Sequence, residues 1–385
     1  MRVATGLAQG RFAEPVLAAR AVEAAMALAG LTHPTAVLLY LTSDFAADPQ
    51  AAVTAASRAA NCLQVSGCTA AGVFTEEDWV LDAPAAVAMV FGDGVDLHPC
   101  LPPSAHTSTH SAAHLANHTL TFVAPNALDM HWLNSGGMRM GGVSGDATGQ
   151  GPYSVWMGGR VQNNARCELG LSGAHMRMGI SQGIRPLTHP AEVQRVQGHD
   201  VYQVGGSTAL GGLVQELPLS LRAPERIPTH LLMAGIPYGE PLNAMEEGRF
   251  HLLPVVGVNA ADKSITVAAE LPPGIDLFWA MRQPQAAEYD MRAMLQRMAP
   301  ADPTPPAFGL MFPCIGRGPW FYGGRDRDIE VVKQKYPDLP LIGFYGNGEI
   351  AHTDGANRLL QYSVVLGLGY DTNTAPALEP APDHV

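Results

Sequence analysis

Three segments of this chain repeat the same order of strands, helix and glycine-containing turn, and this repetition limits the folds that the chain can adopt. In the first segment, residues 35–42 (TAVLLYLT) are short, apolar and bounded by turn residues, as expected of a buried strand. A helix at 49–63, a strand with a glycine turn at 64–74 (QVSGCTAAGVF) and a strand at 85–92 follow. A strand, a crossover helix and a further strand are typical of α/β proteins.

The C-terminal part of the chain repeats this order. Its elements are a strand and polar turn at 308–318, a helix at 325–337, a strand with a glycine turn at 340–350 and a closing strand at 361–369. Aligning GCTAAGVF with GFYGNGEI places Gly67 on Gly343 and Gly72 on Gly348. The two ends of the chain therefore use the same kind of unit.

A looser copy lies between these two, with an apolar strand at 119–125, a glycine-rich turn at 138–149 and a strand at 153–159. Self-similarity of this kind indicates one supersecondary unit that is used several times. We therefore predict an α/β fold of mixed sheets, built from repeated strand, helix, strand, glycine turn and strand units. An α+β arrangement is the alternative.

The length and composition of the chain indicate two domains. Its 385 residues are 47% hydrophobic, which is enough apolar material for two ordinary cores. Residues 212–229 combine two short apolar runs with three prolines, a composition typical of a passage between domains. We predict a first domain at residues 1–211, a second at 212–370 and a disordered proline-rich tail at 371–385.

The charge and the cysteine pattern favour a cytoplasmic protein whose partners are small molecules or other proteins. A net charge of −12 argues against binding to nucleic acid or to anionic lipid. No stretch approaches the roughly 20 consecutive apolar residues of a membrane span, and the first residues lack the apolar segment of a signal peptide. The five cysteines form no CxxC pair and no CxxCH haem-attachment motif, as expected in a reducing compartment.

Four histidines at intervals of four residues raise the question of a metal or haem site. His106, His110, His114 and His118 would sweep one side of a helix whose other side is formed by alanines. This ladder faces away from the apolar side, which favours a solvated surface. Imidazoles at this spacing can chelate Zn, Ni or Cu at a surface, but no further ligands with recognisable spacing complete a structural or catalytic site. We therefore predict surface histidines and no resident metal ion.

The glycine turns are better candidates for a ligand site. A glycine turn after a strand lets backbone N–H groups approach a ligand closely, although none of the glycine motifs of nucleotide-binding proteins is present. Glu349 stands where the first copy has Val73, so the fold does not require a carboxylate at that step. Asp146, in GGVSGDA, is its nearest equivalent in the middle copy. Contact with a ligand would explain these acids.

Cys314 and Arg317, in PCIGRG, lie where the strand 308–313 ends. Crevices beyond the carboxyl ends of parallel strands are where α/β sheets bind ligands. An arginine there can hold a carboxylate through two parallel hydrogen bonds. The alternative for Arg317 is a salt bridge to one of three nearby acids, Asp326, Asp328 and Glu330.

Cys68 belongs to the first glycine turn. A small buried thiol is the ordinary role of such a cysteine. The alternative, which applies to Cys314 as well, is a catalytic nucleophile, and that role needs a nearby histidine or cation. No acid/base constellation accompanies either cysteine in the sequence, which disfavours an enzyme but leaves the question open.

With these motifs in view, the chain resembles the FIST family, a sensory module with an N-terminal and a C-terminal part. The resemblance covers roughly residues 15–370 and is most specific in SGCTAAGVF, GGVSGDA, CIGRG and IGFYGNGEI followed by Asn357. Together with the turns, these motifs define the candidate ligand-binding residues, which are Gly67, Cys68, Thr69, Asp146, Cys314, Arg317, Tyr345, Glu349 and Asn357.

The resemblance implies a sensor of a small ligand, with amino acids proposed for the family. We expect Arg317 to hold a ligand carboxylate, and Glu349 or Asp146 to hold its ammonium group. The resemblance also implies an alternative, because some members are haem-binding nitric oxide sensors that act on a partner histidine kinase; His352, beside the GEI turn, is then the best-placed haem ligand. This chain carries no kinase domain, so its output would pass through a separate protein. A cysteine-dependent enzyme is the third alternative.

Overall fold

The computed structural model describes residues 1–92, 94–100, 118–146, 149–299 and 304–372. The chain forms two compact units, one made of Met1–Ile180 with Met294–Val385 and the other of Ser181–Ala293. The predictions for His106, His110 and His114, and for the tail from residue 373 onward, lie outside the described residues.

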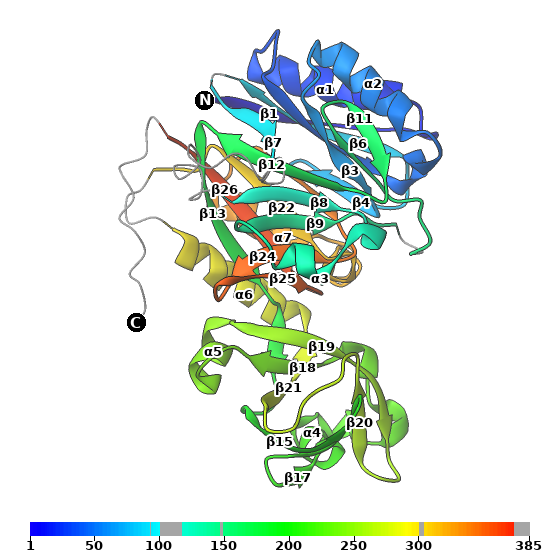
Figure 1. Cartoon of the computed structure of the whole chain (residues 1–385), viewed down its shortest axis with the longest axis vertical. Helices are drawn as coiled ribbons and strands as arrows, with labels where there is room; N and C mark the ends of the chain where they lie inside the picture. The colour runs from blue at the N-terminus through cyan, green and yellow to red at the C-terminus, as the bar shows by residue number, and fades with distance from the viewer. Residues whose placement is uncertain (93, 101–117, 147–148, 300–303, 373–385) are drawn as a thin grey trace. The chain divides into compact units, whose positions relative to one another are not determined.

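The first unit consists of three repeats whose strands follow a common order (Figure 1). The first repeat contains β1 (Arg2–Gln9), α1 (Val16–Ala29), β2 (Ala36–Thr42), α2 (Pro49–Ala60), β3 (Val65–Ala70), β4 (Gly72–Thr75), β5 (Trp79–Val80) and β6 (Ala85–Gly92). The second contains β7 (Asp96–Pro99), β8 (Thr119–Val123), α3 (Met130–Leu133), β9 (Arg139–Val143), β10 (Ser154–Met157), β11 (Arg160–Asn163) and β12 (Arg166–Ser172). The third contains β13 (Ala174–Ser181), α6 (Pro284–Met298), β22 (Phe308–Pro313), α7 (Arg327–Lys335), β23 (Leu341–Tyr345), β24 (Glu349–Thr353), β25 (Ala356–Leu360) and β26 (Val364–Asp371). Residues 284–293 of α6 belong to the second unit.

Each repeat contributes strands to more than one sheet. The three six-stranded sheets have the orders β1-β6-β2-β3-β10-β11, β7-β12-β8-β9-β24-β25 and β13-β26-β22-β23-β4-β5. At the centre of each sheet, two strands of one repeat pair in parallel, namely β2 with β3, β8 with β9 and β22 with β23. The strand after each glycine turn pairs with another repeat, β10 with β3, β24 with β9 and β4 with β23. The predicted mixed α/β fold of repeated units is confirmed, and the repeats interlock.

Glycine is required where the second strand of each parallel pair passes its neighbour. A Cβ atom added to Gly67, Gly141 or Gly343 would lie 1.8 to 2.0 Å from a carbonyl oxygen of the adjacent strand. Real Cβ atoms do not approach backbone oxygen so closely, because the atoms would overlap. The equivalence of Gly67 and Gly343 that the alignment predicted therefore has a steric cause, and Gly141 extends it to the middle repeat.

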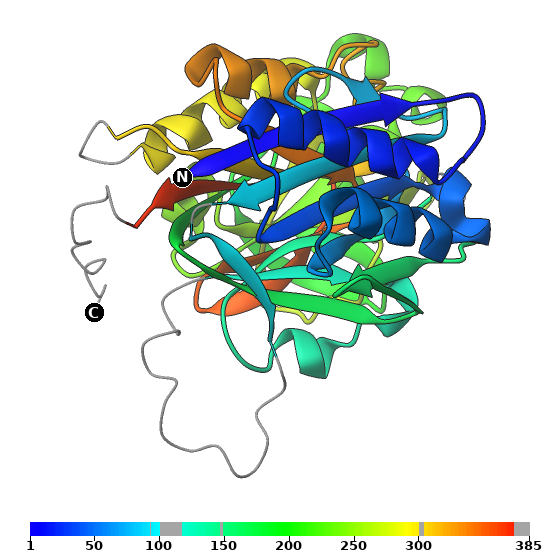
Figure 2. The same ribbon diagram turned by 90° about the horizontal axis from the view of Figure 1, so that it is seen from above.

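Helices α1 and α2 lie side by side on one face of the first sheet (Figure 2). Along β2, Val37, Leu39 and Leu41 face these helices, whereas Leu38 and Tyr40 face the opposite side. Both faces of this strand are buried, and its sequence is a continuous apolar run for that reason.

The side of the first sheet that faces away from α1 and α2 packs into a core shared by all three sheets. Tyr40, Phe122 and Phe312 hold equivalent positions on β2, β8 and β22, and their ring centroids lie 5.3 to 6.5 Å apart. Phe344 contacts all three rings at 4.9 to 5.9 Å. The centre of the unit is therefore an aromatic cluster with one ring from the first strand of each parallel pair.

Tyr40 is the only one of these three equivalent rings that carries a hydroxyl. That hydroxyl is buried and makes no hydrogen bond to any residue in the described ranges. An unpaired buried hydroxyl costs about 1–3 kcal/mol, so we expect Tyr40→Phe to raise the free energy of unfolding by about 1 kcal/mol in urea denaturation. Tyr322→Phe is the matched control: its hydroxyl donates to Asp328 at 2.9 Å, and its loss should lower the free energy of unfolding. Destabilisation by both variants would contradict this interpretation.

The second unit follows β13 in sequence and precedes β22, so it interrupts the third repeat. Its elements are β14 (Ile184–Pro186), β15 (Ala191–Gln197), β16 (Asp200–Val204), β17 (Ser207–Thr208), α4 (Ala209–Glu216), β18 (Leu232–Pro237), α5 (Pro241–Glu247), β19 (Phe250–Asn259), β20 (Ser264–Val267) and β21 (Asp276–Arg282). The strands pair in the antiparallel order β14-β21-β15-β16-β20-β19-β18, and β18 also pairs with β21, so that the sheet closes on itself. Residues 212–229, predicted to be a passage between domains, lie inside this unit. The division into a first domain at 1–211 and a second at 212–370 stays a prediction.

Candidate functional site

The glycine turns of the three repeats lie against one another. The Ser144 hydroxyl donates to the carbonyl oxygen of Thr69 at 2.7 Å, and the Gly145 amide donates to the same oxygen at 3.4 Å. The Asn347 amide donates to the Val143 carbonyl at 3.1 Å, and a Cβ on Gly145 would lie 2.5 Å from the Asn347 side chain. Each turn is where the chain crosses between sheets, so all three crossings meet at one place.

Several residues of the first two turns bond within the turns themselves. The Thr69 hydroxyl lies 3.3 Å from the Ser144 hydroxyl and accepts from the Ser154 amide at 3.2 Å. The Asp146 carboxylate accepts from the amides of Gly149 and Gly151, the latter at 2.8 Å. These bonds stabilise the backbone between β9 and β10.

Arg317 is buried against an acid of its own repeat. It ends a short 3-10 turn, Ile315–Arg317, after β22, and its side chain is only 1% exposed. Its Nε and one terminal nitrogen donate to the two carboxylate oxygens of Asp328 at 3.0 and 2.9 Å. The Tyr322 hydroxyl also donates to Asp328, at 2.9 Å. The predicted alternative of a salt bridge is therefore the observed arrangement, and this guanidinium is occupied by a protein carboxylate.

Asp326 is a second buried acid beside this pair. One of its oxygens accepts from the Ile329 amide at 2.9 Å, which caps the N-terminus of α7. The other accepts from the Tyr345 hydroxyl at 2.5 Å. Burial, and next the neighbouring charge of Asp328, raise the pKa of Asp326 to about 7. Asp326 therefore changes its charge near neutral pH.

Glu349 is fully buried at the start of β24. Its Oε2 accepts from the Ser363 hydroxyl at 2.6 Å and from the Ser363 amide at 3.2 Å. Burial raises its pKa to about 8, against the opposing effects of Ser363, the Cys314 thiol and Arg317. Oε1 accepts no hydrogen bond within the described residues, although the Cys314 thiol is close enough to influence the pKa. Glu349 is therefore mainly protonated at pH 7.

Together these side chains form what we call the acidic network, which consists of Cys314, Arg317, Tyr322, Asp326, Asp328, Tyr345, Glu349 and Ser363. Four of its members are among the predicted site residues, namely Cys314, Arg317, Tyr345 and Glu349. The sequence named Asp326 and Asp328 only as salt-bridge partners of Arg317, and it missed Tyr322 and Ser363. Buried groups with strongly shifted pKa values cluster at functional sites, which makes the acidic network the best-supported candidate site.

A pocket opens beside Asp326, between the β4–β5 hairpin and the start of α7, and we call it the hairpin pocket. Its volume is about 200 Å³. It is lined by Glu76, Glu77, Asp78, Trp79, Gly324, Arg325, Asp326, Ile329, Glu330 and Lys333. Arg325 is paired with Glu330 at 2.7 Å, whereas the half-buried Lys333 makes no hydrogen bond or ion pair with any described residue. The pocket therefore offers charges of both signs, including one unpaired cation.

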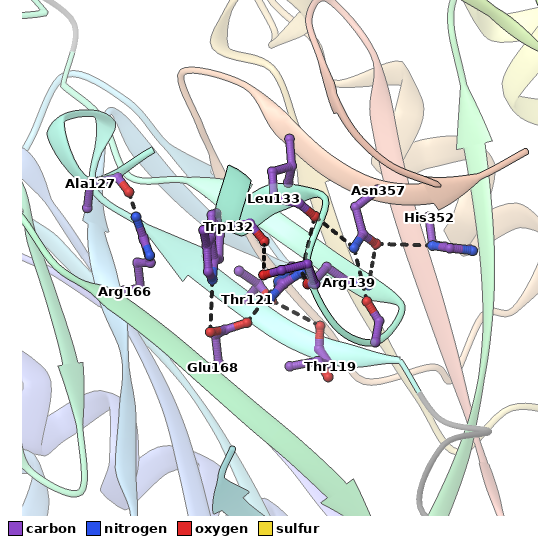
Figure 3. Close-up of polar contacts among 12 residues, drawn as sticks. Thr119, Thr121, Ala127, Trp132, Leu133, Arg139, Arg166, Glu168, His352 and Asn357 are labelled. Carbon is purple, nitrogen blue, oxygen red and sulfur yellow. Dashed lines mark hydrogen bonds and ion pairs between the residues drawn. The ribbon is translucent and has the colours of Figure 1, made fainter. Parts of the chain in front are cut away.

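Asn357 lies in a different cluster, on β25 (Figure 3). Its amide nitrogen donates to the carbonyl oxygens of Leu133 and Gly137 at 2.9 and 3.0 Å. Its Oδ1 accepts from the Arg139 amide at 2.8 Å and contacts His352 Nδ1 at 3.1 Å. Asn357 therefore joins β25 to the loop between α3 and β9. Both the nitrogen and the oxygen of its side-chain amide are bonded to protein groups.

The same cluster contains a tryptophan held between two arginines. The guanidinium carbons of Arg139 and Arg166 lie 4.6 and 4.5 Å from the Trp132 ring centroid. Glu168 accepts from Arg139 at 2.8 Å and from the Trp132 indole at 3.0 Å (Figure 3). This group was not predictable from the sequence, because its members come from α3, β9 and β12 and share no local motif.

His352 is half-buried, and its bond to Asn357 defines its tautomer. Because Asn357 donates through its nitrogen to two carbonyls, its Oδ1 must accept, and His352 Nδ1 must carry the proton. In the neutral ring, Nε2 then carries the lone pair that a haem ligand requires.

His118 departs from the prediction of a surface histidine. It is partly buried just before β8, and its Nδ1 has no hydrogen-bond partner within the described residues. Burial, followed by the neighbouring His352 and His175, lowers its pKa to about 4. The prediction did not include tertiary neighbours: His352 on β24 and His175 on β13 lie close to this residue, and a helical periodicity argument does not identify them.

Four of the five cysteine thiols, those of Cys62, Cys68, Cys100 and Cys167, are poorly suited to nucleophilic chemistry. Cys68 and Cys167 are fully buried, and burial raises the pKa of both thiols. The half-buried Cys62 and Cys100 also have raised thiol pKa values, mainly through burial. A reactive cysteine needs the opposite shift, toward the thiolate.

Two further observations bear on the site. Across the ranges that the structure covers, no helix combines the length and apolar character that a membrane span requires. Within those same ranges, no three or more His, Cys, Asp or Glu side chains are arranged to hold a metal ion.

The interlocked repeats and the acidic network define a mixed α/β protein with a buried ionisable site. Comparison with known proteins identifies the family. The chain belongs to the FIST family and is a FIST sensory-domain protein: residues 35–207 match the FIST N domain and residues 213–352 match the FIST C domain.

Its relatives extend this similarity. The chain is 28% identical to an uncharacterized protein of Mycobacterium tuberculosis (strain CDC 1551 / Oshkosh) over 396 residues, which cover 96% of this chain and 100% of that protein. It is 30% identical to an uncharacterized protein of Mycobacterium bovis over 193 residues, half of each chain. It is also 33% identical to human F-box only protein 22 over 81 residues, 20% of this chain and 19% of that protein.

Proposed function

We propose that this protein is a cytoplasmic sensor that binds an amino acid or another small carboxylate in the hairpin pocket. One observation carries this proposal: the same pocket is lined by Lys333, a cation without an ion-pair partner among the described residues, and by Asp326 of the acidic network. Lys333 can bind a small carboxylate, and a change of charge in the pocket acts directly on Asp326.

The lining of the pocket supports an amino acid as the ligand. Lys333 is available for the carboxylate, because no described residue pairs with it. Glu77 and Asp78 stand on the hairpin and supply negative charge for an ammonium group. Arg317, which the sequence analysis assigned to the carboxylate, is bonded to Asp328 instead, so Lys333 takes that role in the present proposal.

The acidic network provides the means of response. Asp326 titrates near pH 7 and bonds to Tyr345, whose strand β23 pairs with β4 of the hairpin. A ligand charge beside Asp326 shifts its proton equilibrium and hence the charge balance around Asp328. We propose that this change is passed to a separate signalling protein, such as a histidine kinase.

Binding should depend on the charge of Lys333. We expect Lys333→Met to weaken the binding of amino acids or small carboxylates by at least about tenfold, because a hydrogen bond to a charged group contributes about 1.5–3 kcal/mol. Isothermal titration calorimetry, with ligands first selected by thermal-shift screening, measures this change. Lys263→Met is the matched control, since Lys263 is exposed and lies outside the pocket. Equal binding by wild type and Lys333→Met would remove the hairpin pocket as the site.

A haem sensor is the second candidate, because His352 presents a lone pair on Nε2. This function predicts a Soret band in protein expressed with a haem precursor or titrated with hemin, and loss of that band in His352→Ala. His33→Ala, at an exposed histidine of the first repeat, is the control. Colourless protein that does not respond to hemin would eliminate this candidate.

A further inference from the structure

A second pocket lies wholly within the second unit and has no residue in common with the hairpin pocket. Its volume is about 350 Å³, within the range of about 300–1,000 Å³ that is usual for small-molecule sites. Strand β14, the start of β19, the end of α5 and the start of α6 form its walls, and we call it the Gln182 pocket.

Gln182 supplies the feature that points to a ligand. Its side chain lines the pocket although the residue is only 6% exposed. Its amide nitrogen donates to the Phe250 carbonyl at 3.1 Å. A carbonyl can only accept, so this bond fixes the orientation of the amide. The remaining atom, Oε1, accepts no hydrogen bond from any residue in the described part of the chain. This oxygen is not sealed from solvent, so either water or a ligand in the pocket can donate a hydrogen bond to it.

The rest of the lining is mainly apolar. Ile184, Met245, Phe250, Ala286 and the ring of Tyr289 form most of the wall. An apolar wall with one oriented polar group is the usual composition of a site for a small organic molecule. The pocket therefore suits a ring compound better than a chain of polar groups.

The charged residues of the pocket do not require a charged ligand. Asp290 already accepts from the Ser181 hydroxyl at 2.8 Å and from the Gly183 amide at 3.1 Å. Arg185 and Glu246 are exposed and of opposite sign, so water screens both. We propose that the Gln182 pocket binds a small uncharged aromatic ring that donates one hydrogen bond to Gln182 Oε1, as indoles and phenols do.

The test uses the full chain and two probes titrated by calorimetry, indole and N-methylindole, in which a methyl group replaces the donor hydrogen. Wild type should bind indole several-fold more tightly than N-methylindole. Gln182→Leu, which removes the acceptor at similar size, should weaken indole binding by roughly tenfold and abolish this preference, since a buried hydrogen bond contributes about 1 kcal/mol or somewhat more. Lys333→Met should leave the binding of indole unchanged, which separates this proposal from the function proposed for the hairpin pocket.

A second pair of variants keeps the test decisive if Gln182→Leu does not fold. Ala286→Trp fills the pocket from α6 and should abolish binding of both probes, whereas Gln285→Trp, at the exposed neighbouring position, should not. The proposal is overturned if neither probe binds wild type, if wild type does not distinguish the two probes, or if Ala286→Trp binds indole as wild type does.

Discussion

Replacing Asp328 with alanine should lower the free energy of unfolding by about 3–5 kcal/mol, because it leaves the guanidinium of Arg317 buried without its partner. Arg317 and Asp328 are 1% and 0% exposed, and two parallel hydrogen bonds join them. Arg317→Met should cost a similar amount for the converse reason. The double variant Arg317→Met/Asp328→Ala should lose much less than the sum, since it removes both charges from the interior. Urea denaturation of the four proteins gives the coupling energy.

The exposed pair of Arg325 and Glu330 is the control for this experiment. Its members are 74% and 38% exposed and lie 2.7 Å apart, and such pairs contribute about 0–1 kcal/mol. Arg325→Met should therefore change stability little. If Asp328→Ala were as mild as Arg325→Met, or if the double variant lost the full sum, the buried pair would not be the structural centre of the acidic network.

The second large effect concerns pH. The pKa of Glu349 is raised to about 8 in the folded protein, mainly by burial. In the unfolded chain the carboxyl loses its proton near its ordinary pKa of about 4.3, whereas the folded protein keeps it up to about pH 8. The folded state therefore binds more protons between these values, and the stability that Glu349 supports is complete below about pH 4 and is lost as the pH rises toward 8.

Glu349→Gln resembles the protonated side chain at every pH, so it should not lose this stability. We expect the difference in free energy of unfolding between Glu349→Gln and wild type to grow by roughly 4 kcal/mol from pH 4.5 to pH 9, since each pKa unit corresponds to about 1.4 kcal/mol. Urea denaturation across this range measures the difference. Asp326 titrates in both proteins and largely cancels in this comparison. Parallel stability curves for the two proteins would show that Glu349 is not held in its neutral form.

The internal repeat provides a further control for Glu349. The equivalent residue of the first repeat, Val73, is also fully buried. Glu349→Val should therefore fold and, like Glu349→Gln, should lack the pH-dependent loss of stability. The same variant tests function. If Glu349→Val folds but no longer responds to its ligand, the carboxyl of Glu349 is retained for sensing.

Part of the candidate site was predictable because the three repeats differ at a few positions. Comparing Glu349 with Val73 identified an acid that the fold does not require, and the end of β22 identified Arg317 and Cys314. The role given to Arg317 was not predictable. Whether it holds a ligand or a protein carboxylate depends on the position of Asp328, and both choices are consistent with the same local sequence.

The Asn357 cluster shows the same limit. The family motifs indicated Asn357, but its partners Leu133 and Gly137 lie more than two hundred residues away in the chain. Trp132, Arg139 and Glu168 form no motif that sequence comparison within the chain could reveal. His118 is partly buried rather than on the surface, and its charged neighbours, His352 and His175, are also distant in sequence.

The sequence by itself determined the local units: the apolar strands, the helices that join them and the glycines at each turn. These features depend on residues close in sequence, through side-chain periodicity, helix capping and the absence of a Cβ. Only the tertiary structure decided that each strand after a glycine turn pairs with a different repeat, and that Asp326 and Glu349 are buried enough to titrate near neutral pH. Strand pairing and desolvation both depend on which distant segments lie alongside, and the local sequence does not carry that information.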